Sequence, residues 1–216
     1  TLFVSPERPF RGAPVRVLAV SDRPLAAELR VEVEGASAGA PLAASEARRG
    51  GPPYFWVTEV KAPPAGKLVA TLTQRACEPG VGQVERRVAI ARGAPSVPPL
   101  PKDKVWPARG SWTRAHENVY SAWIEALFDA PDGEQPSWSA LHEVLRDPKR
   151  NLLFDHLGAG EDSTSAPVVR PDCADLPYFL RAYFAFKLRL PFGLAECTRG
   201  GGGAPPSCKG LITNED

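Results

Sequence analysis

The residues of this sequence whose chemistry could support catalysis are its cysteines and histidines. Cys173 precedes the strongest helical pattern of the chain, in which apolar side chains recur at helical spacing as far as Leu188. A thiol at a helix start lies among unpaired backbone N–H groups and at the positive end of the helix dipole, where an anion is favoured. Because the thiolate is the nucleophilic form of cysteine, Cys173 is the candidate nucleophile. The alternatives are an inert buried thiol or a disulfide with Cys77.

Two carboxylates flank this cysteine. Asp172 and Asp175 are most simply explained as residues that cap and support the helix start, not as an acid–base pair. Pro177 fits a helix only in its first turn, which places the start near Asp175. In that case Cys173 lies just outside the first turn, and the helix dipole stabilises its thiolate less.

The residues around Cys173 also carry a family resemblance. The run Asp172-Cys173-Ala174-Asp175-Leu176, after an extended segment, resembles the Asp-Cys-Ser/Ala-x-Leu signature of NlpC/P60-type, papain-like cysteine hydrolases of secreted bacterial proteins. The resemblance covers about one helix of the chain. It implies that Cys173 attacks an amide carbonyl of a peptide or peptidoglycan substrate and forms a thioester, with no cofactor.

The sequence departs from that family in its histidines. The family places the catalytic histidine after the cysteine, whereas His116, His142 and His156 all precede Cys173. We therefore expect a fragment that ends before its general base, with the missing C-terminal segment of the same protein as a partner. An upstream histidine acting as the base, or a dead site, is the alternative. At positions like those of the three histidines, a histidine is more often packed in the core or exposed at the surface than it is a catalytic base.

Two further functions stay open. A β-sandwich joined to a helical module could be a non-catalytic binding or scaffold protein of the cell envelope. A transglutaminase-like acyl transferase would use the same cysteine but resolve the thioester with an amine. The state of the Cys173 thiol, free in a cleft or inert, distinguishes the enzymes from the binding module.

The remaining cysteines indicate an oxidising compartment. Cys197 and Cys208 bracket a Gly/Pro-rich segment without a hydrophobic pattern, and a disulfide between them would close a small loop, contributing about 3 kcal/mol. A metal site is not predicted, because there is neither a Cys-x-x-Cys pair nor a nearby histidine. The chain has no methionine and begins at Thr1, which favours removal of a signal peptide and a periplasmic or secreted protein.

Composition excludes several classes of function. The 216 residues include 26 basic and 25 acidic side chains, a net charge of +1, whereas a nucleic-acid surface would be visibly basic. No run approaches the ~18 apolar residues of a membrane-spanning helix. The apolar content of 43% is sufficient for folding.

The pattern along the chain predicts an α+β protein in two domains. Residues 1–93 read as an all-β, immunoglobulin-like sandwich, because short alternating or β-branched runs are separated by Gly/Pro turns. A proline-rich linker follows at 94–107. Residues 108–216 are expected to form the mainly helical front half of a papain-like domain, truncated before the catalytic histidine. The predicted strands are 2–4, 15–20, 28–33, 54–60, 68–73 and 84–90, and helices are predicted at 113–128, 137–146, 151–157 and after Cys173.

Overall fold

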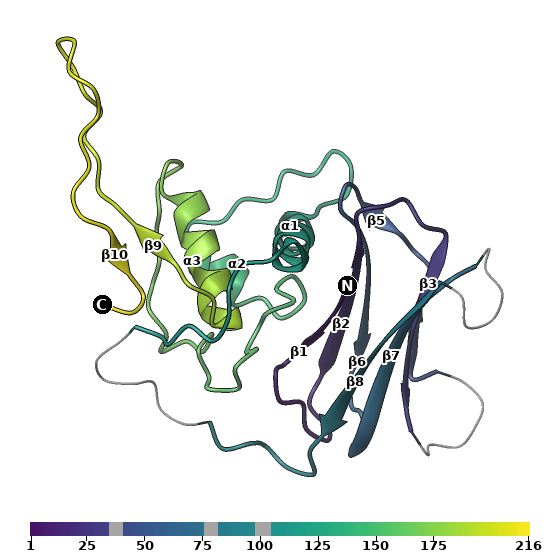
Figure 1. Cartoon of the computed structure of the whole chain (residues 1–216). Helices are drawn as coiled ribbons and strands as arrows, with labels where there is room; N and C mark the ends of the chain where they lie inside the picture. Colours follow the sequence, from purple (N-terminus) through teal and green to yellow (C-terminus); the bar gives the residue numbers. More distant parts are fainter. Residues whose placement is uncertain (35–40, 76–81, 98–104) are drawn as a thin grey trace. The chain divides into compact units, whose positions relative to one another are not determined.

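The fold is taken from a computed structural model that describes residues 1–34, 41–75, 82–97 and 105–216 (Figure 1). By its internal contacts the chain divides into two compact units. Unit 1 comprises residues 1–97 and 114–170, and unit 2 comprises residues 98–113 and 171–216. Of the predicted linker, residues 98–104 lie outside the described part of the chain.

Unit 1 contains two four-stranded antiparallel sheets that face each other. The first has the order β1-β2-β6-β5 and the second β4-β3-β7-β8, which corresponds to the A-B-E-D and C′-C-F-G pattern of immunoglobulin-type sandwiches. The strands of the first sheet are β1 (Leu2–Ser5), β2 (Val15–Ser21), β6 (Tyr54–Val60) and β5 (Arg49–Gly50). Those of the second are β4 (Ala43–Ser45), β3 (Ala27–Val33), β7 (Gly66–Gln74) and β8 (Gln83–Ile90).

The core of unit 1 lies between the two sheets. Inward-facing side chains of β2, such as Val15 and Val17, pack with those of β3 and β7, such as Leu29 and Leu68. At one side, Arg86 of β8 donates a hydrogen bond of 2.9 Å from Nη1 to the carbonyl oxygen of residue 2 in β1. Burial lowers the pKa of this guanidinium from its usual value.

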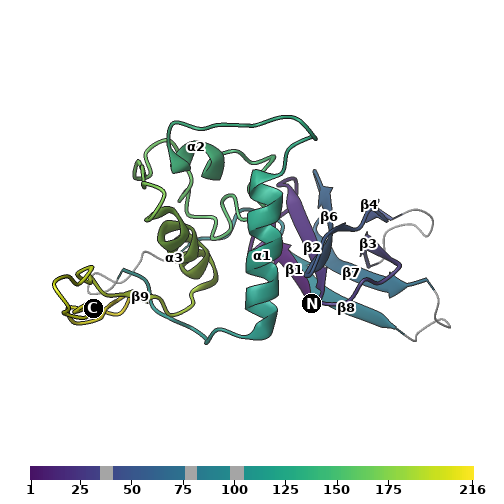
Figure 2. The ribbon, with the colours of Figure 1, turned by 90° about the horizontal axis from the view of Figure 1, so that it is seen from above.

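Strand β2 is buried on its outer face as well. Leu18 and Val20 point away from the core between the sheets, yet both are 2% exposed. Helix α1 (Arg114–Phe128) lies along this side of the sheet, as Figure 2 shows, and contacts β2. The helix buries Trp123 and Leu127. A strand covered on both faces has a continuous apolar sequence, and residues 17–20 of β2 follow this pattern, whereas Arg16 interrupts it.

The predicted papain-like front half for residues 108–216 is wrong, and so is the α+β fold class built on it. The described part of this region contains only three short helices, α1, α2 (Leu141–Leu145) and α3 (Leu176–Leu188), and turns make up most of the remainder. Helices α1 and α2 belong to unit 1 together with the β-sheets. The chain is therefore mostly β-structure and turns.

The error is clearest at residues 151–157, which form turns in place of a helix. The Asn151 side chain accepts a hydrogen bond from the Leu153 N–H (2.9 Å) and donates one to the Leu145 carbonyl (2.7 Å). Asp155 has a left-handed backbone with φ of 49°, and its N–H donates to the Asp162 carboxylate at 2.7 Å. Short polar side chains here bond the backbone locally, and this competes with helix formation.

Unit 2 is built around α3 and a long hairpin. Trp106 is 7% exposed and donates from its indole nitrogen to the Leu190 carbonyl at 2.9 Å. The buried Asn214 side chain donates a hydrogen bond to the Trp106 carbonyl and accepts one from the Phe192 N–H. These bonds hold residue 214 against the segment that follows α3. The hairpin begins with β9 (Gly193–Leu194) pairing with β10 (Ile212–Thr213), and Figure 1 shows it extending beyond the end of α3.

Among the helices that the described residues form, none has both the length and the apolar character needed to cross a bilayer.

Candidate functional site

Cys173 is a free, exposed cysteine in the turn that precedes α3. The Asp172 carboxylate accepts hydrogen bonds from the N–H groups of Ala174 (2.8 Å) and Asp175 (2.9 Å). The Asp175 side chain makes no capping hydrogen bond, and its backbone is already helical. Of the two predicted capping carboxylates, Asp172 is therefore the one that bonds the backbone at the helix start.

This arrangement bears on what Cys173 could do. The N–H groups of Ala174 and Asp175 are the donors nearest in sequence that could hold an oxyanion, and both already bond the Asp172 carboxylate. The helix itself begins at Leu176, so the thiol precedes the first helical residue. The Asp172 carboxylate also places a negative charge beside the turn that carries the thiol.

The histidines lie in a different part of the molecule from Cys173. All three belong to unit 1, and Cys173 belongs to unit 2. His156 is 5% exposed, its Nδ1 lies 3.0 Å from the hydroxyl of the fully buried Ser5, and its ring stacks on Phe3. His142 accepts at Nδ1 from the Val169 N–H at 3.3 Å. Both rings are used in packing and local bonding within unit 1.

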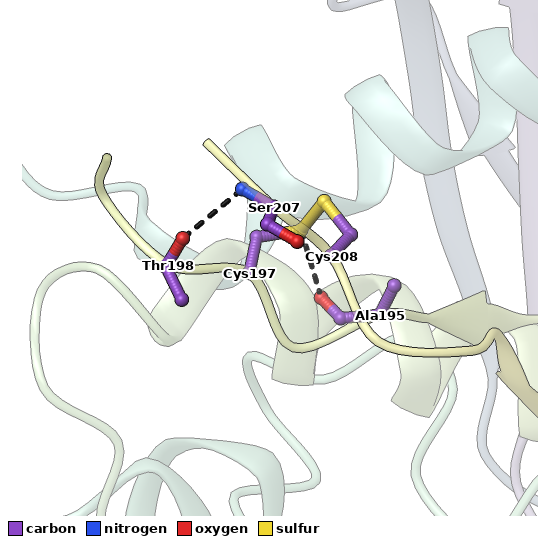
Figure 3. The surroundings of a disulfide bond; sticks show 5 residues. All are labelled: Ala195, Cys197, Thr198, Ser207 and Cys208. Atoms are coloured by element: carbon purple, nitrogen blue, oxygen red, sulfur yellow. Dashed lines mark hydrogen bonds between the residues drawn. A yellow bond between two sulfur atoms is a disulfide. The ribbon is translucent and has the colours of Figure 1, made fainter. Parts of the chain in front are cut away.

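Cys197 and Cys208, the pair predicted from the sequence, are joined by a disulfide in the structure (Figure 3). The bond crosses the hairpin of unit 2, where the Thr198 N–H donates to the Ser207 carbonyl at 2.8 Å and the Ser207 N–H donates to the Thr198 hydroxyl at 3.0 Å. Lys209 and Glu196 form an ion pair of 2.6 Å beside it. The disulfide therefore braces an exposed two-stranded segment that has no hydrophobic core of its own.

Unit 1 contains a cavity of about 400 Å³ that sequence analysis did not find. Three segments form its walls. The first wall is the turn between β1 and β2 together with the start of β2, with Pro6, Arg8, Phe10, Ala13, Pro14 and Arg16. The second, after β8, has Ala94 and Pro95, and the third consists of Pro148, Phe154, Asp155, Leu157 and Gly158 from the turns after α2. Most of these side chains are apolar.

Backbone hydrogen bonds fix the walls to one another. The Glu7 N–H donates to the His156 carbonyl at 2.8 Å, which ties the first wall to the third. The Arg11 N–H donates to the Ala91 carbonyl at 2.8 Å, which ties the first to the second. Four prolines restrict the walls further, because their φ angles are fixed. The cavity is thus largely formed before any ligand arrives.

Three charged side chains line the cavity. Arg16 is 8% exposed and is held by the Glu59 carboxylate at 3.3 Å and by the Phe154 carbonyl at 3.3 Å. The Asp155 carboxylate accepts from the Gly160 N–H at 3.0 Å. Arg8 is exposed at the rim, and its Nη1 donates to the Ser96 carbonyl at 3.3 Å.

Within the described residues, no three His, Cys, Asp or Glu side chains are grouped so as to hold a metal ion.

Comparison of the chain with known families, curated proteins and solved structures gives no match in any of the three. The residues and their geometry are therefore the basis for a functional proposal.

Proposed function

We propose that this chain is a ligand-binding module and that the unit 1 cavity is its ligand site. The observation that carries the proposal is the cavity itself, whose volume of about 400 Å³ lies within the range of small-molecule sites. Its apolar lining, with few charged groups, is typical of such sites. The walls come from segments that are fixed to one another by hydrogen bonds, so little ordering is needed on binding.

The disulfide supports a place of action outside the cytoplasm. Disulfides persist in oxidising compartments, whereas cytosolic reductants keep thiols reduced. The Cys197–Cys208 bond is exposed on the hairpin, where a reductant would reach it. We therefore propose a periplasmic or secreted binding module.

A neutral fluorescent probe tests the binding function. Phenylnaphthylamine should bind one site per chain, with a dissociation constant on the order of tens of micromolar, because burial of its two aromatic groups supplies several kcal/mol. The variant Ala13→Phe places a ring in the cavity and should abolish this binding. Ala44→Phe adds the same ring at an exposed position of β4 and should leave it unchanged. Equal binding by both variants would refute the cavity as the site.

The second candidate function is a cysteine hydrolase that uses Cys173. The observation that favours it is a free, exposed thiol at the start of α3, within the run that resembles NlpC/P60-type enzymes. The Cys173 thiolate would attack the carbonyl carbon of a peptide or peptidoglycan amide, and the protonated amine would leave. Water would then cleave the thioester to a carboxylate and the free thiol; an acyl transferase would use an amine in place of water. We place this second because Asp172 occupies the nearby N–H donors.

Alkylation by iodoacetamide at a series of pH values tests the hydrolase. The variant Cys77→Ser leaves Cys173 as the one cysteine outside the disulfide. An activated nucleophile should react at full rate well below the pH at which a free cysteine ionises. A rate profile like that of a free cysteine peptide would count against the hydrolase.

A further inference from the structure

We propose that the ligand of the unit 1 cavity is an amphipathic anion, an apolar body that carries one carboxylate, and that Arg8 binds the carboxylate. The proposal rests on the binding function proposed above and narrows it to a class of ligand. The main observation behind this proposal is that an exposed arginine lies at the rim of an apolar, preformed cavity.

The apolar body follows from the side chains that line the cavity. Phe10 and Phe154 present aromatic rings, and the prolines and alanines add further apolar surface. An apolar group that enters is removed from water, which contributes about 25 cal/mol per Å² buried. A polar body would lose its hydration without gaining hydrogen bonds in return.

The three charged groups of the lining differ in how they are held. Arg16 is nearly buried, and the Glu59 carboxylate and the Phe154 carbonyl both hold its guanidinium. The Asp155 carboxylate accepts the Gly160 N–H. These contacts are made within the fold, and the bond from Arg16 to the Phe154 carbonyl joins the first wall of the cavity to the third.

Arg8 differs from them by its exposure. The hydrogen bond that the structure gives its side chain is a long one of 3.3 Å from Nη1 to the Ser96 carbonyl. A guanidinium has five N–H donors, so this bond fixes the group at the rim and leaves donors that can bind a carboxylate side by side. Apolar walls strengthen such a contact, because the effective dielectric constant is lower there than in water.

The sign of the charge also favours an anion. Of the charged groups that line the cavity, Arg16 is paired with Glu59, Asp155 is half-buried, and Arg8 is the most exposed to solvent. A cationic ligand would have to approach past Arg8, whereas an anion is attracted to it. A carboxylate can be supplied by a free acyl acid or by the C-terminus of a peptide, and both offer the same chemistry to Arg8.

A pair of dyes with similar aromatic bodies tests the role of Arg8 in the whole chain. Anilinonaphthalene sulfonate carries an anion and phenylnaphthylamine does not. The variant Arg8→Gln should weaken binding of the anionic dye about fivefold to tenfold and change that of the neutral dye less than twofold. Arg11→Gln removes an exposed arginine outside the lining and should change neither. Urea unfolding of each variant checks that the fold is kept.

Salt and competitors extend the test. High salt should weaken binding of the anionic dye to the unchanged chain, because salt screens an exposed ion pair. It should have less effect on binding to Arg8→Gln, which lacks that ion pair. Octanoate represents the free acids and acetylphenylalanine represents a peptide C-terminus; whichever displaces the anionic dye identifies the source of the carboxylate. Acetylphenylalanine amide, which lacks the charge, should displace it more weakly than acetylphenylalanine.

The outcomes separate this proposal from the one on which it rests. If Ala13→Phe abolishes binding of both dyes but Arg8→Gln changes neither, the cavity binds ligands and the anion proposal is overturned. If neither octanoate nor acetylphenylalanine displaces the dye, the proposal that the ligand carries a carboxylate is overturned. If neither dye binds, or Ala13→Phe has no effect, the binding function itself fails.

Discussion

At the scale of single residues, buried polar side chains shape the segments that have no regular secondary structure. Asn151 is fully buried and bonds three groups, the Trp123 indole nitrogen, the Leu145 carbonyl and the Leu153 N–H. It thereby connects α1 with the turns after α2. These turns form the third wall of the cavity, so the shape of the cavity depends on a residue that does not line it.

The variant Asn151→Ala should lower the free energy of unfolding by about 2–4 kcal/mol, because buried donors and acceptors lose their partners. Urea denaturation followed by tryptophan fluorescence measures the change. Asn118→Ala, on the half-buried side of α1, should alter stability by less than about 0.5 kcal/mol. Similar effects of the two variants would contradict the role given to Asn151.

A second residue-scale prediction concerns Ser5. Its hydroxyl is fully buried and lies 3.0 Å from His156 Nδ1, so Ser5→Ala removes this partner from a buried ring nitrogen. We expect a loss of about 1 kcal/mol, measured by urea denaturation. Ser121→Ala on the exposed side of α1 is the control and should be neutral or slightly stabilising, since alanine favours helix. No difference between them would mean that the Ser5–His156 contact contributes nothing.

At the scale of elements, the hairpin of unit 2 differs from the core strands of unit 1, such as β2, β3 and β7. The unit 1 sheets bury a shared core, whereas residues 193–211 of the hairpin are exposed throughout. Two-stranded hairpins are marginally stable in water without other support. The Cys197–Cys208 disulfide supplies that support by closing a loop with a sequence separation of 11.

Replacing both cysteines, Cys197→Ser with Cys208→Ser, should release the hairpin locally. In the chain-entropy model a loop of this size contributes about 3 kcal/mol, and that contribution acts on the hairpin and not on the sheets. Hydrogen exchange read by mass spectrometry should show faster exchange across residues 193–213 and unchanged exchange in β2, β3 and β7. Faster exchange in β2, β3 and β7, or unchanged exchange in the hairpin, would contradict a local role of the disulfide.

At the scale of the whole molecule, each compact unit is assembled from segments that are not adjacent in sequence. Unit 1 adds α1 to the outer face of a sheet whose last strand, β6, ends more than fifty residues earlier in the chain. Leu18 and Val20, on the outer face of β2, are buried on the side where α1 contacts this strand. The sequence predicts that residues 1–93 fold as a domain of their own. Truncated chains test this prediction.

A chain that ends at Val97 should unfold at lower urea concentration than one that ends at Arg170, because it lacks the cover of α1. Each buried aliphatic side chain left exposed forfeits about 1.5–3 kcal/mol. The shorter chain should also bind anilinonaphthalene sulfonate at its uncovered face. If it is as stable as the longer chain and binds no dye there, the sandwich folds without α1.

The sequence alone determined those elements whose pattern reflects a single buried face. The predicted strand at 54–60 coincides with β6, and that at 15–20 is within one residue of β2. The predicted helix at 113–128 starts one residue before α1. Cys197 and Cys208 were also paired from sequence, because the segment between them has nothing else to hold it. In each case the information is local, carried by residues a few positions apart.

Tertiary structure decided everything that depends on distant segments. Strands β4 and β5 are three and two residues long, too short for a periodic pattern, and they exist because β3 and β6 pair with them. The apolar run at 151–157 resembles a helix, but buried hydrogen bonds to Asn151 and Asp162 make it a series of turns. The cavity joins residues near 10, 95 and 155, and no spacing along the chain encodes such a meeting. Only packing of the folded chain brings these walls together, which is why the sequence pointed to Cys173 and not to the cavity.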